Sequence, residues 1–154
     1  ASLGFIRYLP SQHRAQNRMK KGGQIMARHR RSLEVSGVKH AAPIPMGARV
    51  GNMVFSSGIM GQDPATGKLP EDPEQQAYFA FQNMQAMMQE AGGDIGDIGH
   101  ITVFIKDNSL REHVNKQWLA FYPDESDRPA RHAILLDLPS GMLVQLEVIA
   151  VLKD

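Results

Sequence analysis

The segment from Asp72 to Gly93 constrains the fold most, because it carries signals for both ends of a long amphipathic helix. Asp72 precedes Pro73 and stands three residues before Gln75, an order typical of a helix start with a capping box. Gly92 and Gly93 end the helical pattern. Between these signals one face is apolar, formed by Ala77, Ala80, Phe81, Met84, Met87, Met88 and Ala91. A helix with one apolar face must pack against another layer.

Segments with strand patterns lie on both sides of this helix. The run from Ala48 to Phe55 predicts a hairpin that turns at Gly51-Asn52. The β-branched and aromatic run 101–105 predicts a later strand, and Ser109 with Glu112 predicts a second capping box and helix that Pro123 closes. The apolar stripe of this second helix is Leu110, Val114, Trp118 and Phe121. The remaining predicted strands are 33–35, 130–136 and 142–152, so three strands, a helix, a strand, a helix and two strands follow one another.

Two amphipathic helices that each follow a strand pack most simply on the same face of one sheet, since crossover connections are right-handed. The last predicted strand has an apolar row suited to such helices, made of Val144, Leu146, Val148 and Ala150. The alternate row is too apolar to leave in water and consists of Gln145, Glu147, Ile149 and Val151. We therefore predict an α+β domain with a single sheet, two helices on one face, and a homo-oligomer that buries the other face.

Composition narrows the class of protein. The chain has 154 residues, enough for one domain, and no apolar run approaches the roughly 20 residues that span a bilayer. We therefore expect a soluble protein without a membrane partner. The sequence contains no cysteine, which excludes disulfides, thiolate metal sites and cysteine nucleophiles and fits a cytoplasmic location.

Charge divides the chain unevenly. Residues 1–33 hold eight of the 17 Lys and Arg and none of the 16 Asp and Glu, so the rest of the chain is acidic. We divide the sequence into a basic N-terminal extension, residues 1–31, and a globular domain, residues 32–154. A basic extension fits a transit peptide, a nucleic-acid arm, a membrane-surface segment, or sequence ahead of a native start near Met26. We assign it no function.

Several blocks of the domain resemble one known family. They are Pro129-Ala130-Arg131-His132 with Leu138-Pro139 and the run 143–150, the run 50–58, Asp63 to Gly67, Val103 to Asp107, and Val114-Asn115. In this order they are similar to the Rid family of enamine/imine deaminases, the YjgF-type proteins, over about residues 33–152. The resemblance implies a chorismate-mutase-like fold and a homotrimer with three intersubunit clefts. It also implies hydrolysis of reactive imines of amino-acid metabolism to 2-oxo acids and ammonia, with no cofactor.

The resemblance also indicates site residues. Arg131 matches the family's carboxylate-binding arginine, and a guanidinium fork suits a carboxylate because it makes two parallel charged hydrogen bonds. From spacing alone, a surface ion pair of Arg131 with Asp127 or Glu125 is the alternative. Ser57 and Asn115 match further family positions, with structural roles at the strand end and on the helix as alternatives. The amides of Gly58 and Ile59 are candidate donors to the substrate.

Three positions depart from the family pattern. Ile44 stands where a tyrosine is common, Ala133 where many members have cysteine, and Gln145 where they have the glutamate thought to activate water. A carboxylate accepts a proton at neutral pH, whereas an amide only hydrogen-bonds. Glu147 lies two residues along the same strand face, where an interface ion pair is its ordinary role.

Three functions therefore stay open. The first is a 2-iminobutanoate/2-iminopropanoate-type deaminase, with Arg131, Gln145 and Ser57 as the catalytic candidates and a small carboxylate-bearing metabolite as partner. The second is a non-catalytic trimer that binds 2-oxo or amino acids in the same cleft. The third, RNA binding or cleavage, is opposed by the acidic domain and supported only by the basic extension, so we expect no nucleic-acid partner. The histidines show no metal-ligand spacing, and we expect no metal.

Overall fold

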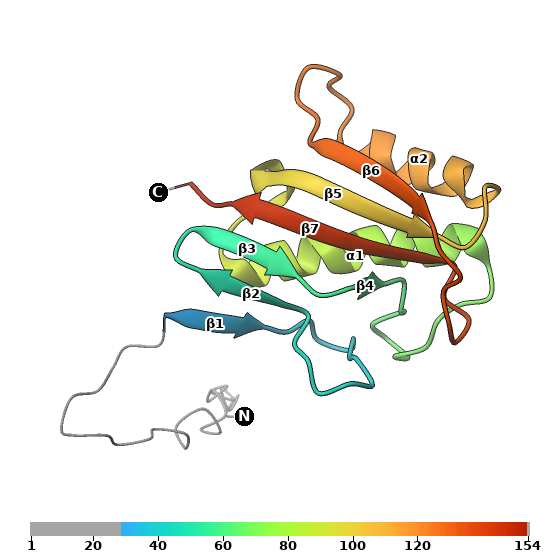
Figure 1. Cartoon of the computed structure of the whole chain (residues 1–154), viewed down its shortest axis with the longest axis horizontal. Helices are drawn as coiled ribbons and strands as arrows, with labels where there is room; N and C mark the ends of the chain where they lie inside the picture. Colours follow the sequence, from blue (N-terminus) through green and yellow to red (C-terminus); the bar gives the residue numbers. More distant parts are fainter. Residues whose placement is uncertain (1–28, 154) are drawn as a thin grey trace, which may run out of the picture.

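The computed structural model describes residues 29–153, so the predicted extension lies almost entirely outside the described part. A single mixed sheet forms the domain, with strands in the order β1-β2-β3-β7-β5-β6 and a short β4 paired to β7 (Figure 1). Among the strands of residues 29–153, β5 and β6 pair in parallel and the other neighbours are antiparallel. The strands are β1 (Arg30–Leu33), β2 (Gly47–Val50), β3 (Met53–Ser56), β4 (Ile59–Met60), β5 (Ile98–Ile105), β6 (Ala130–Leu135) and β7 (Val144–Val151).

The predicted hairpin is confirmed, since β2 and β3 pair across the turn at Gly51-Asn52, where Gly51 has a φ of 61°. The first predicted strand was placed too late. The strand is Arg30–Leu33 rather than 33–35, because pairing with β2 aligns Leu33 with Gly47 and leaves Val35 in an isolated bridge. β4 was not predicted, because two residues are too short for a periodic pattern.

The two helices are α1 (Pro73–Ala91) and α2 (Leu110–Phe121), and a short 3-10 helix η1 (Ile95–Asp97) precedes β5. At the start of α1 the Asp72 carboxylate accepts a hydrogen bond of 3.1 Å from the Gln75 amide, and Gly92 ends the helix with a φ of 88°. The predicted capping box of α2 is wrong. Ser109 has helical backbone angles, and its hydroxyl donates to the Asp107 carboxylate instead of capping the helix.

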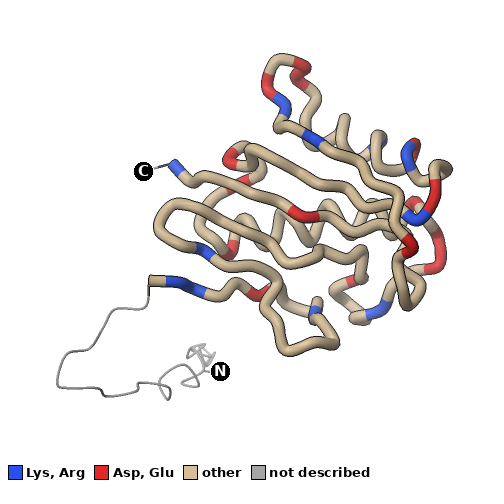
Figure 2. Tube along the Cα trace, in the orientation of Figure 1, with Lys and Arg blue, Asp and Glu red and all other residues tan. Residues whose placement is uncertain are grey.

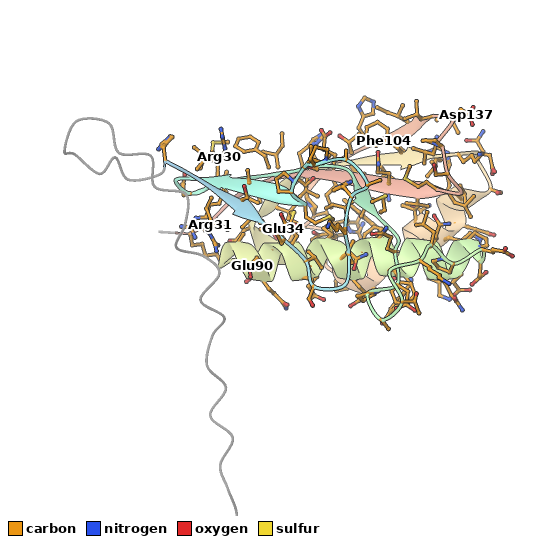
Figure 3. All side chains as sticks on the ribbon, turned by 90° about the horizontal axis from the view of Figure 1, so that it is seen from below. Arg30, Arg31, Glu34, Glu90, Phe104 and Asp137 are labelled. Atoms are coloured by element: carbon orange, nitrogen blue, oxygen red, sulfur yellow. The ribbon has the colours of Figure 1, made fainter. Side chains whose placement is uncertain are left out.

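Both helices cover one face of the sheet, as predicted, and Figure 3 shows them below it. The buried row of β7 packs against the apolar faces of the helices. The alternate residues of β5, Ile101, Val103 and Ile105, belong to the same core. The row of alternate residues on β7 lies on the other face. The sequence therefore identified correctly which side of this strand faces the core.

The sheet face that no helix covers carries large apolar side chains that are exposed. Each is more than a third exposed: Met53, Phe55, Ile134, Ile149 and Val151. Phe104 belongs to the same face, opposite Glu90 of α1 (Figure 3). In Figure 2 the charged residues lie mostly in loops and around the rim, while the strands themselves are largely uncharged. We call the face formed by these six residues the open face.

One buried amide joins α1 to the loop before β7. Gln76 is 1% exposed, and its Nε2 donates 2.9 Å hydrogen bonds to the carbonyls of Pro70 and Gly141. Its Oε1 accepts a 2.8 Å hydrogen bond from the Leu143 amide. This loop is therefore held by a residue that lies far from it in the chain. Within residues 29–153, no helix has the length and apolar character needed to cross a bilayer.

Candidate functional site

Arg131 lies on β6, at the edge of the sheet above α2. The parallel register aligns it with Ile101, whose side chain is buried against the helices, so Arg131 belongs to the helix-covered face. Its Cζ lies 4.6 Å from the centroid of the Trp118 ring on α2. A guanidinium at this distance over an indole face makes a cation–π contact that holds the charged head in place. The sheet edge and the helix thus position the arginine together.

The Arg131 guanidinium has no acidic partner among the described residues, so the ion pair with Asp127 or Glu125 that spacing allowed is not formed. Partial burial lowers the pKa of Arg131, and the neighbouring charge of Arg111 lowers it further. Arginine nevertheless stays protonated at neutral pH. The site therefore presents a fixed positive charge whose donors make no ion pair with an acid in residues 29–153.

Asn115 lies on the flank of α2 that borders β6. It follows Arg111 by one turn and precedes Trp118 by three residues, so the three side chains are neighbours along the helix. Asn115 is exposed, and its side chain makes no hydrogen bond to any residue in the described part of the chain. The tethering role that sequence left open for it is therefore not observed, and the amide is available beside the arginines.

Ser57, Gly58 and Gln145 form a second cluster, beside β4. The Ser57 hydroxyl donates a 2.7 Å hydrogen bond to the Pro45 carbonyl, which anchors the loop before β2 to the end of β3. Gln145 pairs with Met60 in the β4–β7 register and packs against Gly58, where a Cβ would lie 2.4 Å from its Nε2. Glycine at 58 thus makes room for the Gln145 amide.

The remaining candidates of this cluster differ in accessibility. Ile59 is 0% exposed as a whole residue, so neither its side chain nor its backbone amide lies at the surface of the chain. Ile44 is 48% exposed, in a loop that lines an open hollow of about 650 Å³ together with Pro43 and Pro45. Sequence placed the isoleucine at a tyrosine position of the site, and the structure puts it on the surface.

Within one chain the two clusters do not meet. Gln145 pairs with Phe104 and belongs to the open face, whereas Arg131 belongs to the helix-covered face. They are also two strands apart, since β5 lies between β7 and β6, and neighbouring strands are about 4.8 Å apart. A small metabolite bound to Arg131 therefore cannot reach Gln145 of the same chain.

His132 and Glu147 lie on the open face, paired with the same residue, Thr102. Neither lies on the face of Arg131. Alternation along a strand gives this directly for His132, the neighbour of Arg131, and the strand register shows it for Glu147. Glu147 has no ion-pair partner in residues 29–153, so a structural pair within the chain does not account for it. Within the same residues no group of three metal-ligating side chains comes together.

Sequence reasoning missed two residues of the arginine cluster. Trp118 was assigned only to the apolar stripe of α2, although its ring also supports Arg131. Arg111 was not considered, although a spacing of seven residues places it two turns before Trp118 on almost the same line of the helix. The seven-residue spacing is the sequence signal that could have identified Arg111 as a neighbour of Trp118.

The sequence matches a known protein family. The model of the family described as Endoribonuclease L-PSP matches residues 38–152. The 2-iminobutanoate/2-iminopropanoate deaminase of Escherichia coli K12 is 35% identical over 111 residues, which cover 71% of this chain and 87% of that protein.

Solved structures agree in fold. RidA of the Antarctic bacterium Psychrobacter sp. PAMC 21119 superposes with a TM-score of 0.73 at 29% identity and covers 79% of this chain and 99% of its own. E. coli TdcF with bound serine gives a TM-score of 0.72 at 31% identity, with 80% and 99% covered.

Proposed function

The chain belongs to the Rid family, and on that premise we propose that it hydrolyses reactive 2-imino and 2-enamino acids to 2-oxo acids and ammonia. The observation that carries this proposal is Arg131, a guanidinium held over Trp118 with no acidic partner among residues 29–153. A fork of free donors at a sheet edge suits the carboxylate that every such substrate carries. The relative named as a 2-iminobutanoate/2-iminopropanoate deaminase supports the reaction class.

The reaction requires the protein mainly to position the substrate and a water molecule. An enamine first takes a proton on carbon and becomes the imine. Water then adds to the imine carbon, its two protons pass to the nitrogen, and the carbon–nitrogen bond breaks, which releases ammonia and leaves the oxygen on the carbon as a carbonyl. An imine protonated on nitrogen attracts water without a strong base. In our proposal Arg131 holds the carboxylate, Asn115 contacts the same substrate, and Gln145 orients water by hydrogen bonding without removing its proton. Ser57 holds the loop before β2 against the end of β3, and the backbone amide of Gly58 faces the substrate.

The site in this proposal spans two subunits of a homotrimer. Arg131 and Gln145 of one chain lie on opposite faces of the sheet, so one copy must supply the arginine cluster and a neighbour the Gln145 cluster. The apolar open face gives copies of the chain a reason to associate.

A second function, binding of small 2-oxo or amino acids without turnover, is favoured by one specific observation. Gln145, beside Gly58, offers an amide where a carboxylate would be needed to accept a proton. The TdcF structure with bound serine shows that a relative holds an amino acid. The two functions share Arg131 and differ only in turnover.

A coupled assay separates them. 2-Aminoacrylate is generated in situ, and pyruvate formation is followed with and without the protein. We expect faster pyruvate release than the uncatalysed rate. Release at the uncatalysed rate, together with measurable affinity for 2-oxo acids, would leave the binding function instead.

Mixing of inactive variants tests the shared site. Arg131→Ala damages one cluster and Gly58→Val the other, and each alone is expected to be inactive. In trimers reassembled from an equal mixture, about a quarter of the sites are expected to combine two intact clusters. No recovery of activity in mixed trimers would show that the site does not span subunits.

A further inference from the structure

The strip of surface between α2 and β6 has an arginine near each end. α2 connects the parallel strands β5 and β6 and therefore runs antiparallel to β6. Arg131, early in β6, lies above Trp118 near the end of the helix. Arg111 is in the first turn of the helix, about two turns from Trp118, and so lies beside the later part of β6. We call this surface the α2–β6 strip.

Neither arginine is neutralised by the domain. Within residues 29–153 Arg31, Lys106 and Lys116 have carboxylate partners, whereas Arg111 and Arg131, like the remaining Lys and Arg there, have none. Arg111 instead donates from Nε to Asn108 Oδ1 at 3.0 Å, which orients its head and leaves the terminal nitrogens free. The two charges are close enough that Arg111 lowers the pKa of Arg131.

The surface between the two arginines carries small and neutral groups. Ala133 follows Arg131 by two residues on the same face of β6 and carries only a methyl group. Asn115 lies one turn beyond Arg111 and adds neutral hydrogen-bonding groups. A surface with two unpaired like charges favours a ligand that carries two negative charges, because a monoanion relieves only one of them.

We propose that Arg111 is a second carboxylate-binding residue and that the preferred substrates are the imines and enamines of dicarboxylic amino acids. This inference rests on the proposed function for the reaction, but the choice of ligand rests on the arginine pair alone. In this arrangement Arg131 binds the carboxylate next to the imine carbon, and Arg111 binds the carboxylate of the side chain.

Binding of stable product analogues tests the proposal. Trp118 is the single tryptophan of the chain and lies under Arg131, so its fluorescence reports ligand binding. We expect 2-oxoglutarate to bind roughly 10- to 100-fold more tightly than 2-oxobutanoate, since hydrogen bonds to charged groups contribute this much. Calorimetry of the same pair provides an independent affinity.

Two variants remove one positive charge each from α2. In Arg111→Gln we expect the preference for 2-oxoglutarate over 2-oxobutanoate to disappear, because loss of the second positive charge weakens binding of a dianion more than binding of a monoanion. Lys116→Gln is the matched control, because Lys116 is bound to Glu74 and is not part of the α2–β6 strip. The control is expected to keep the preference.

The outcomes separate this inference from the proposed function. Equal affinity of the wild type for both ligands, or a preference that survives in Arg111→Gln, overturns the inference; hydrolysis of monocarboxylate imines then leaves the proposed function intact. An Arg111-dependent preference without imine hydrolysis supports the ligand class and removes the enzymatic function.

Discussion

The two clusters of the site differ in how their polar groups are used. At β6 and α2, Arg131 and Arg111 leave charged donors without acidic partners in the described residues. At β4 and β7, the Ser57 hydroxyl is bound to the Pro45 carbonyl, and Gln145 packs against Gly58. The difference shows that the polar groups of the first cluster are available to a ligand, whereas those of the second mainly hold the neighbouring backbone. Changes in the first should reduce ligand binding, whereas changes in the second should reduce stability as well as turnover.

The largest effect is expected from Arg131→Ala. Loss of a charge-assisted, bidentate contact should weaken binding of 2-oxo acids by roughly 2–5 kcal/mol. Titration of Trp118 fluorescence, or calorimetry because the variant also changes the environment of the ring, measures the loss. Arg131→Lys should recover little, since an ammonium does not reproduce the fork. Unchanged affinity in Arg131→Ala would remove the distinction between the clusters.

Two glycines beside the second cluster test its role in stability. A Cβ at Gly61 would lie 2.1 Å from the carbonyl oxygen of Gln76, a backbone atom of α1, so Gly61→Ala should lower the free energy of unfolding by roughly 1–3 kcal/mol. A Cβ at Gly58 would meet only the flexible end of Gln145, so Gly58→Ala should cost less. Urea denaturation of both variants compares them. An equal loss in the two would mean that the Gln145 side chain cannot move.

A smaller effect is expected from Ser57→Ala. Removal of the hydroxyl leaves the Pro45 carbonyl without its donor, which should lower the free energy of unfolding by about 1 kcal/mol. Ser56→Ala is the neighbouring control, because the Ser56 hydroxyl accepts from the Val148 amide at 2.8 Å and its loss should also cost stability. Steady-state kinetics decide the role of Ser57. If Ser57→Ala kept its stability but hydrolysed the imine at least about 100-fold more slowly, the hydroxyl would be catalytic.

The smallest effect is expected from Gln145→Glu. A deaminase that orients water through the amide should gain rate or change little when a carboxylate takes its place, since a carboxylate also accepts the proton. The coupled pyruvate assay measures the change, and unfolding curves verify that Gly58 tolerates the new side chain. A complete loss of turnover would show that the amide donor itself is required.

Much of the fold followed from the sequence because periodicity and helix-end signals act locally. The alternation along β7 identified its buried row, and Asp72 with Gly92 marked both ends of α1. Ser109 shows the limit, because the nearby Asp107 carboxylate competes for its hydroxyl. Spacing does not reveal whether the hydroxyl accepts from a helix amide or donates to a nearby carboxylate.

The site was less accessible to sequence reasoning. Motifs located Arg131 and Gln145, but their separation onto opposite faces follows from strand pairing, which joins residues far apart in the chain. The support of Arg131 by Trp118 likewise depends on how α2 lies against β6. Contacts of this kind arise from the tertiary structure and leave only a weak spacing signal.

Gln76 gives the site a further property. Its buried amide holds the carbonyl of Gly141 and the amide of Leu143, so the path of the chain just before Gln145 is fixed from α1, outside the site. Side chains at position 145 can then change from one homologue to another while the backbone that presents them keeps its place. Because the residues that fix this path lie on α1 and in the loop before β7, a substitution at Gln145 is expected to leave the backbone of β7 in place.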